Sequence, residues 1–255
     1  MPSFRLIVPA LLALALLGAP RPASAQSFSD TQRGDIETIV RNYLIAHPEV
    51  LEEAMAELSK RQAAADAAKH EASIATNADT IFNSPRGVVL GNKDGDVTFV
   101  EFFDYNCGYC KRAMTDMLDL MKADSKLKVV LKEFPVLGQG SVEAAQVAIA
   151  VRMQDPTGKR YLDFHQKLLG GRGQADKARA LAVAKELGFD MARLEKDMAS
   201  PEAKATIEEN FKLAEDMGMN GTPSYVIGKH VVVGAVGLDG LREKISQARC
   251  GKATC

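Results

Sequence analysis

The stretch Val97–Lys111, VTFVEFFDYNCGYCK, decides the fold of this chain. Its first seven residues form a nearly continuous β-prone run that only Glu101 interrupts, which is typical of a strand covered on both faces. The motif Cys107-Gly108-Tyr109-Cys110 follows directly. After it, apolar residues recur at helical spacing, and a second β-prone run begins at Val129. We therefore expect a β-α-β unit with a CxxC motif where the first strand meets the helix.

The position of this motif predicts redox chemistry. If the helix begins at the motif, Cys107 lies at its N-terminus, where unpaired N–H groups and the helix dipole stabilise an anion. The pKa of a free thiol, about 8.5, then falls by several units. Cys110, one turn along and more covered, is placed to attack a mixed disulfide and release the partner. The sequence thus predicts Cys107 as the nucleophile and Cys110 as the resolving thiol.

Other interpretations of the four cysteines stay open at this point. The CxxC pair could be half of a zinc site completed by Cys250 and Cys255, although zinc pairs usually lie on turns. It could also form a structural disulfide, although so short a loop favours lability. For Cys250 and Cys255 themselves we predict a second disulfide that pins the end of the chain. A metal site, or a relay to the CxxC pair, is the alternative for the tail.

Downstream of the second strand, the pattern from Ser141 to about Met217 is helical only. Gly221-Thr222-Pro223 then precedes two short β-prone runs that flank Gly228-Lys229-His230, which predicts a hairpin. Proline lacks an N–H and can adopt the cis form, which would expose the backbone of Thr222 beside the cysteines. That backbone could pair with an extended substrate as an added strand. Thr222 and Pro223 are therefore candidate substrate-binding residues.

Upstream, residues 1–25 have the features of a secretory signal peptide. A positive charge at Arg5, a short apolar run and the small residues Ala23-Ser24-Ala25 follow one another, and we expect cleavage after Ala25. Residues 26–76 carry a capping box at Ser29–Gln32 and two apolar stripes at helical spacing, which predicts helices without a partner of their own. They pack either on the main domain or on copies of themselves.

Composition excludes several classes of protein. Of 255 residues, 46% are hydrophobic and 25% are charged, which are ordinary globular fractions and exclude wholesale disorder. The formal net charge of −1 gives no electrostatic footprint for nucleic acid, and we expect no nucleic-acid partner. We expect an exported protein in a compartment that permits disulfides, with no resident cofactor and no resident metal. The redox-active group would be the Cys107–Cys110 disulfide, although the two thiolates could also bind Cu(I).

Three segments resemble the DsbA family of exported thiol:disulfide oxidoreductases, and within it the branch that contains ScsC, the suppressor of copper sensitivity, and the Com1-type proteins. The segments are Val100–Lys111, Glu133–Gly138 and Gly221–Ser224. The resemblance covers about Ile81 to Leu241. The paired-helix start, including His47-Pro48-Glu49-Val50, is similar to the N-terminal oligomerisation segment of ScsC-like proteins, and that similarity is shorter and less specific.

The resemblance implies an α/β protein: a thioredoxin fold in residues 77–255 with a helical insertion at about 139–217, preceded by a helical oligomerisation segment, 26–76. It implies a cis bond at Thr222-Pro223. It also implies that Glu101 is a buried acid that tunes the thiolate, unless Glu101 is simply a strand-edge residue paired with Lys132. Gly108 and Tyr109, between the cysteines, differ from the Pro-His of the prototype oxidase.

As for activity, the resemblance implies a periplasmic disulfide isomerase or reductase that acts on exported cysteine-containing clients. A membrane redox partner would reset the dithiol, and the N-terminal helices would form a dimer or trimer. Threonine before the proline is similar to isomerase-type members, whereas the prototype oxidase has valine there. Dithiol oxidase and Cu(I)-binding copper-tolerance protein are the alternatives.

Overall fold

The computed structural model of the chain describes residues 28–255. The predicted signal peptide, residues 1–25, lies outside the described residues. The chain divides into two compact units, one that ends at Ser59 and one that begins at Lys60. No helix in the described part of the chain combines the length and the apolar character needed to cross a bilayer.

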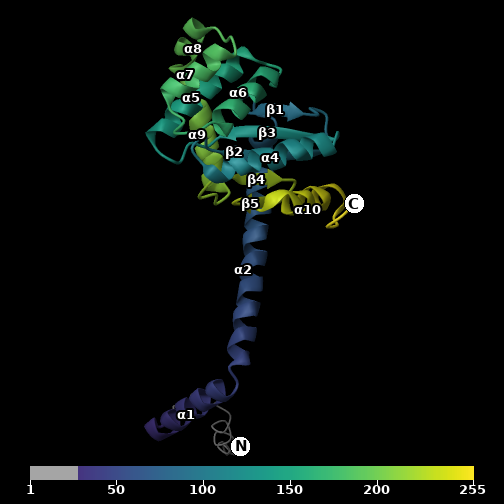
Figure 1. The fold of residues 1–255 in the computed structure, drawn as a ribbon. Coiled ribbons are helices and arrows are strands. Elements are labelled where there is room, and N and C mark those ends of the chain that lie inside the picture. Colours follow the sequence, from purple (N-terminus) through teal and green to yellow (C-terminus); the bar gives the residue numbers. More distant parts are fainter. Residues whose placement is uncertain (1–27) are drawn as a thin grey trace, which may run out of the picture. The chain divides into compact units, whose positions relative to one another are not determined.

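The first unit contains α1 (Asp30–Ala46) and the first part of α2 (Glu49–Thr76) (Figure 1). The predicted capping box is confirmed: Gln32 N–H donates to Ser29 Oγ at 3.3 Å, and Ser29 N–H donates to Gln32 Oε1 at 2.9 Å. No residue of α1 is buried. Large apolar side chains of this unit are exposed by 41–68%, namely Ile36, Ile39, Val40, Tyr43, Ile45, Leu51, Met55 and Leu58. The two apolar stripes therefore have no cover within their own unit.

The second unit is built on a five-stranded sheet with the strand order β1-β3-β2-β4-β5. The central strands β2 (Val97–Phe103) and β3 (Leu127–Glu133) are parallel. They are joined by α4 (Gly108–Ala123). The other pairs are antiparallel: β1 (Val88–Gly91) lies on β3, and β4 (Ser224–Ile227) lies between β2 and β5 (His230–Val233). The predicted β-α-β unit and hairpin are confirmed.

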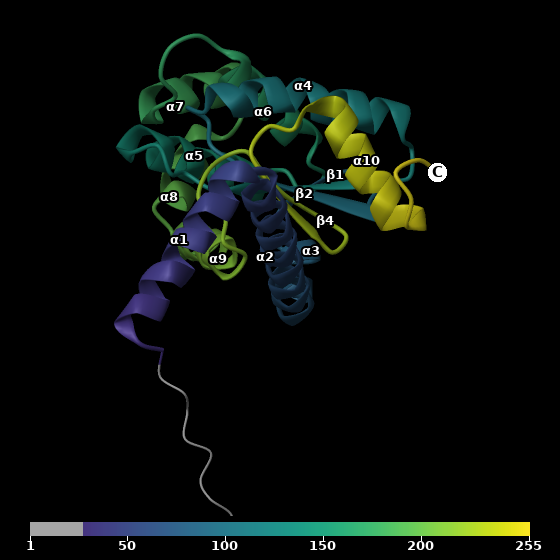
Figure 2. The ribbon, with the colours of Figure 1, turned by 90° about the horizontal axis from the view of Figure 1, so that it is seen from below.

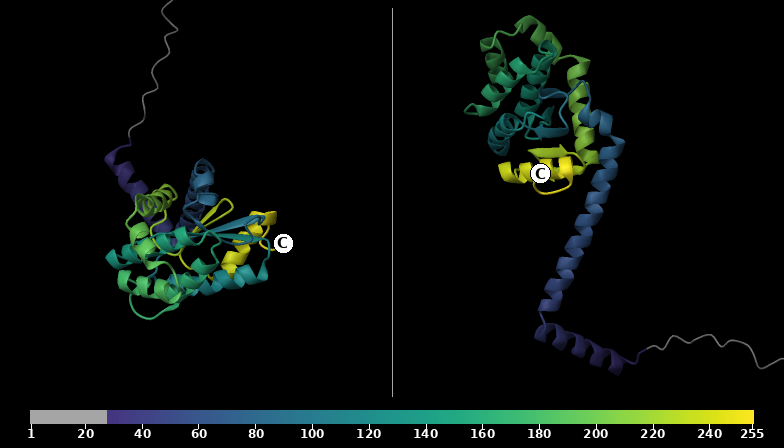
Figure 3. Two further views of the ribbon diagram at one scale, coloured as in Figure 1. Left: turned by 90° about the horizontal axis from the view of Figure 1, so that it is seen from above. Right: turned by 90° about the vertical axis from the view of Figure 1, so that its right-hand side faces the viewer.

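Each face of the sheet carries its own core. Figure 2 shows α4 and α10 (Gly237–Cys250) on one face, and α3 (Ala78–Phe82) and α9 (Pro201–Asp216) on the other. Phe99 and Phe103 point to the α4 side with both cysteines of the motif, whereas Val100 and Phe102 point to the α9 side. Figure 3 shows α9 beside the last turns of α2, where Ser73 Oγ donates to the Asp216 carbonyl at 2.8 Å.

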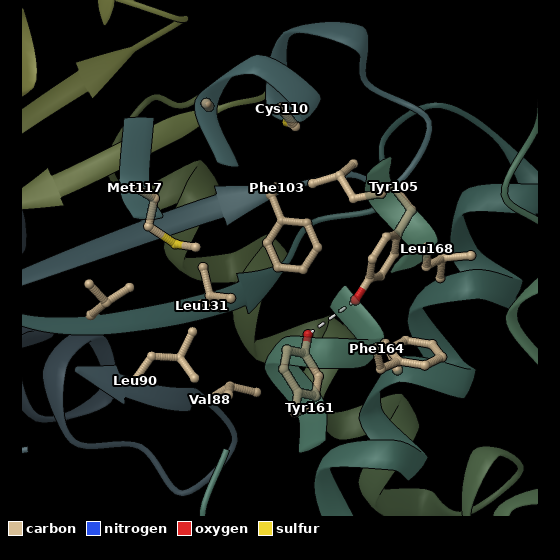
Figure 4. Close-up of a cluster of buried hydrophobic side chains, with 14 of the residues drawn as sticks. Val88, Leu90, Phe103, Tyr105, Cys110, Met117, Leu131, Tyr161, Phe164 and Leu168 are labelled. Atoms are coloured by element: carbon tan, nitrogen blue, oxygen red, sulfur yellow. Dashed lines mark hydrogen bonds between the residues drawn. The ribbon is translucent and has the colours of Figure 1, made fainter. Parts of the chain in front are cut away.

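The predicted helical insertion consists of five helices between β3 and β4: α5 (Gln139–Gln154), α6 (Lys159–Gly170), α7 (Lys177–Glu186), α8 (Met191–Met198) and α9. Its aromatic side chains extend the α4-side core. Figure 4 shows Tyr161 and Phe164 of α6 next to Tyr105, with Phe103, Leu131 and Met117 from the sheet and α4 beyond them. The insertion therefore packs against the segment that leads into the CxxC motif.

Strand β1 is an addition to the sequence prediction, which counted four strands. It has only four residues and lies at an edge of the sheet, where it pairs with β3 alone. So short a run gives little periodicity, and pairing with a strand about forty residues away decides its conformation.

Candidate active site

Cys107 is the N-cap residue of α4, as the sequence predicts. Its backbone is extended, with φ −83° and ψ 114°, and its Sγ accepts a hydrogen bond from Cys110 N–H at 3.4 Å. The side chain is 7% exposed, whereas that of Cys110 is fully buried. Both residues are free cysteines. Cys107 therefore keeps a small exposed area, whereas Cys110 lies entirely inside, in the first turn of the helix.

A loop from the far end of the chain closes the site. The Thr222–Pro223 peptide bond is cis, as expected, and the Thr222 carbonyl lies 3.2 Å from Cys107 Sγ and accepts a hydrogen bond from it when the thiol is protonated. Pro223 directly precedes β4, the neighbour of β2 in the sheet. Two segments that are more than a hundred residues apart in the sequence thus bring a thiol and a backbone carbonyl together.

The pKa values of the two thiols move in opposite directions. The pKa of Cys107 falls to about 5, mainly because the Cys110 thiol hydrogen-bonds to it. The Thr222 side chain and the N–H groups of Cys110 and Tyr109 add to this, and partial burial opposes it. Burial raises the pKa of Cys110, and the proximity of Cys107 and Glu101 raises it further. At neutral pH the dithiol therefore holds one thiolate, on the outer sulfur.

Glu101 is buried on the same face of the sheet as the cysteines, and it is 3% exposed. Burial, together with the nearby Cys107 and Asp116, raises its pKa to about 8. It pairs in register with Tyr225 of β4. A carboxyl group with such a pKa is protonated at neutral pH and can exchange a proton in the physiological range.

Lys132 requires a correction, because the sequence suggested it as a partner for Glu101. Side chains alternate along a strand, and Lys132 points to the opposite face of the sheet. There its ammonium group donates to the Thr80 carbonyl at 3.0 Å and lies 3.5 Å from Glu209. Burial lowers its pKa to about 8, and Glu209 opposes that shift. Lys132 thus belongs to a buried ion pair remote from the thiols.

The two residues between the cysteines face outward. A Cβ atom added at Gly108 would meet no atom within 4 Å. Tyr109 is 57% exposed, and the guanidinium group of Arg112 lies 4.6 Å from the centre of its ring. This dipeptide is available for contact with another protein.

Cys250 and Cys255 are joined by a disulfide at the end of α10. Both residues are exposed. No three His, Cys, Asp or Glu side chains among residues 28–255 lie close enough to hold a metal ion, so the two cysteine pairs do not assemble the zinc site weighed above.

Two residues that the sequence did not single out also shape the site. Asp104 and Asn106 lie between β2 and Cys107 and make hydrogen bonds to the helical insertion, including one to Ser141. Their place inside the quoted stretch is the only sequence signal for them, because their partners are distant along the chain.

A thioredoxin fold with a CxxC pair at this helix N-terminus, facing a cis-proline loop, defines the class of thiol:disulfide oxidoreductases. Comparison with known families agrees. Residues 98–246 match the DSBA-like thioredoxin domain, and residues 32–65 match the N-terminal domain of the copper resistance protein ScsC. The chain belongs to the DsbA-like thioredoxin-domain family, and its form is that of the ScsC-like members.

Individual relatives support this placement. A thioredoxin-like oxidoreductase from Silicibacter pomeroyi is 44% identical, with a TM-score of 0.64 over 67% of this chain and 96% of that one. A linker-deletion mutant of ScsC from Proteus mirabilis is 28% identical, with a TM-score of 0.65 over 88% of this chain and 98% of that one. Disulfide bond formation protein D from Bacillus subtilis is 29% identical over 64% of this chain and 78% of its own length.

One group of relatives is much longer than this chain. The Na(+)/H(+) antiporter NhaA 1 from Salinispora arenicola is 24% identical over 65% of this chain, which spans only 25% of the antiporter. The similarity therefore concerns one part of that protein.

The thiolate assignment predicts a distinctive reactivity. At pH 5 we expect iodoacetamide to alkylate Cys107 of the reduced protein a few tens of times faster than free cysteine. Half of a thiol with a pKa near 5 is ionised at that pH, against less than about one thousandth of an ordinary thiol. The lower nucleophilicity of a weakly basic thiolate removes part of this gain. Mass spectrometry of quenched samples measures the rate, with urea-unfolded protein as the control. A rate that rises about tenfold per pH unit from pH 5 to 8 contradicts the assignment.

Proposed function

We propose that the protein is a periplasmic thiol:disulfide oxidoreductase that isomerises or reduces disulfides in exported proteins. The observation that carries the proposal is the place of Cys107 Sγ, which accepts a hydrogen bond from Cys110 N–H at the N-terminus of α4 and lies 3.2 Å from the Thr222 carbonyl. The pKa of this thiol is lowered to about 5, which favours the thiolate. Isomerisation begins with thiolate attack on a wrong disulfide, so a thiolate that is present at neutral pH is its first requirement.

The chemistry runs through a mixed disulfide. The Cys107 thiolate attacks one sulfur of a client disulfide, a Cys107–client bond forms, and the other client sulfur leaves as a thiolate. In isomerisation, another client thiolate attacks the mixed disulfide and releases Cys107, with no net transfer of electrons. In reduction, the Cys110 thiolate attacks Cys107 Sγ instead. The Cys107–client bond breaks and the second client sulfur leaves as a thiolate, so the client gains two electrons and the Cys107–Cys110 disulfide remains. A membrane redox partner then returns those two electrons.

The surrounding residues have supporting roles in this scheme. Cys110 must lose a proton before it attacks, and Glu101 is the buried group placed on its face of the sheet to exchange that proton. The backbone at Thr222, beside Cys107, pairs with an extended client segment as an added strand. Gly108 and Tyr109 meet the client at the surface. The Cys250–Cys255 disulfide pins the tail and takes no part.

The uncovered apolar residues of α1 and α2 support self-association. Exposed side chains such as Ile39, Met55 and Leu58 are each 66–68% exposed. An apolar surface of this kind is stable in water only when something covers it. We propose that residues 26–76 associate with the same residues of other copies, as a dimer or trimer, and that residues 77–255 carry the chemistry. Export to the periplasm rests on the signal peptide predicted in residues 1–25.

Two assays run in parallel test the proposed activity. The mature protein is added in catalytic amount to a scrambled, fully oxidised multi-disulfide enzyme, and recovery of that enzyme's activity is followed. The same protein, pre-oxidised, is added to the fully reduced form of the enzyme. We expect reactivation of the scrambled form to be accelerated more strongly. If only the oxidative folding of the reduced enzyme is accelerated, the result supports the dithiol oxidase instead. If neither assay is accelerated, the proposal is wrong.

A further inference from the structure

The three residues that join β2 to Cys107, Asp104, Tyr105 and Asn106, are all hydrogen-bonded to the helical insertion through their side chains. These three residues form the connecting segment. Two of them, Asp104 and Tyr105, are buried. The segment that delivers Cys107 to α4 is therefore fixed by a part of the chain that contains neither cysteine.

Asn106 makes the most specific of these connections. Its Nδ2 donates to the Ala175 carbonyl at 2.8 Å, and its Oδ1 accepts from Ala175 N–H at 2.7 Å. One side-chain amide thus pairs with both backbone groups of a single buried residue just before α7. Its Nδ2 also donates to Ser141 Oγ at 2.9 Å, in the first turn of α5. Two separate segments of the insertion meet at this one side chain.

Asp104 links the connecting segment to Cys107 through hydrogen bonds. Its Oδ1 accepts from Asn106 N–H and from Ser141 Oγ, both at 2.7 Å, and its Oδ2 accepts from Leu137 N–H at 2.9 Å. Its own carbonyl accepts from Cys107 N–H at 3.1 Å. The turn that ends at Cys107 is therefore held at both ends, and Ser141 bridges Asp104 and Asn106.

Tyr105 makes the third connection, to α6. Its hydroxyl lies 3.3 Å from the Tyr161 hydroxyl, which Figure 4 marks, and 3.4 Å from His165 Nδ1. Tyr161 in turn donates to Glu133 Oε1 at 2.5 Å. This contact fixes the ring of Tyr105, whereas the backbone of the turn is held by the hydrogen bonds of Asp104 and Asn106.

We propose that Asn106 is a positioning residue, through which the helical insertion fixes Cys107 against the α4 N-terminus and the Thr222 loop. The proposal rests on the proposed role of Cys107 as the nucleophile. Asparagine suits the position because its amide both donates and accepts. Aspartate cannot donate to the Ala175 carbonyl, and alanine leaves both backbone groups of Ala175, which is 2% exposed, without this partner.

The test compares Asn106→Ala with a matched variant, Gln154→Ala. Gln154 makes the same paired contact elsewhere in the insertion: its amide donates to the Asp190 carbonyl and accepts from Asp190 N–H, each at 3.0 Å. The midpoint of thiolate absorbance at 240 nm is measured in each reduced, full-length protein, together with the melting temperature.

In Asn106→Ala we expect that midpoint to rise by about one pH unit, because a displaced Cys107 weakens a hydrogen bond to the charged sulfur. In Gln154→Ala we expect a lower melting temperature. The midpoint of the thiolate absorbance should stay at the parental value. Ser141→Ala, which removes the bridging hydroxyl and adds no charge, is expected to raise the midpoint in the same direction by less.

The outcomes separate this proposal from the one on which it rests. A parental midpoint near 5 that is unchanged in Asn106→Ala overturns the positioning role alone. Should Asn106→Ala fail to fold, an unchanged midpoint in Ser141→Ala overturns it equally. A parental midpoint near that of free cysteine removes the role of Cys107 as an activated nucleophile, and the positioning role with it.

Discussion

Replacing Cys107 with alanine is expected to abolish the reactivation of a scrambled client. Every route in the proposed chemistry begins with attack by this sulfur, and the remaining thiol of the motif is fully buried with a raised pKa. Cys110 cannot substitute as the first nucleophile, because the thiolate is the attacking species and this buried thiol, with its raised pKa, cannot reach a client disulfide as a thiolate. Client reactivation should fall to the uncatalysed rate, and the assay described above measures it directly.

Cys110→Ala is the matched variant, because it removes the second sulfur and keeps the first. We expect it to attack clients and then stall, so that a covalent Cys107–client adduct accumulates and is visible on non-reducing gels. Cys107→Ala should form no adduct. Client reactivation by Cys107→Ala at more than about a tenth of the parental rate contradicts the assigned order of attack.

Removing the first unit is expected to convert the protein to a single copy in solution and to reduce isomerase activity by about tenfold or more. Several sites on one assembly rebind a client before it diffuses away, whereas isolated sites lose it after each encounter. The deletion should end at Ser59 and should not extend to Thr76, because Ile74 is buried and Ser73 hydrogen-bonds to Asp216. Light scattering gives the mass, and the scrambled-client assay gives the activity.

A substitution in the full-length chain separates association from truncation. Ile39→Glu with Leu58→Glu places charges on the exposed apolar stripes of α1 and α2. Val89→Glu places one on an exposed apolar residue of β1, as the control. The double variant should behave as the deletion does, and the control should keep the parental mass. A deletion variant that stays associated, or a single copy with full isomerase activity, contradicts this view of the N-terminal helices.

The sequence was most informative where short-range patterns decide the structure. The β-prone run before Cys107, the helical spacing after Cys110 and the turn at Gly228 are local signals, and the structure places a strand, a helix and a hairpin there. The capping box at Ser29 is equally local.

Pairings across long distances in the chain could not be predicted in the same way. In the register of β2 with β3, the residue beside Glu101 is Leu131, and Lys132 is the next one along β3. Only this register shows that the side chains of Glu101 and Lys132 point to opposite faces of the sheet. Asn106 is an ordinary turn residue by sequence. Its partner Ala175 is a backbone group 69 positions away, and a backbone group has no signature in the sequence.

The open space around Gly108 has an evolutionary consequence. Its backbone is not left-handed, and a Cβ atom added there would meet no atom within 4 Å, while Tyr109 beside it is 57% exposed. The amino acids in the middle of the motif can therefore be exchanged without repacking the interior. Substitutions at these two positions can therefore change the surface that the motif presents to another protein while the core that holds the two sulfurs stays the same.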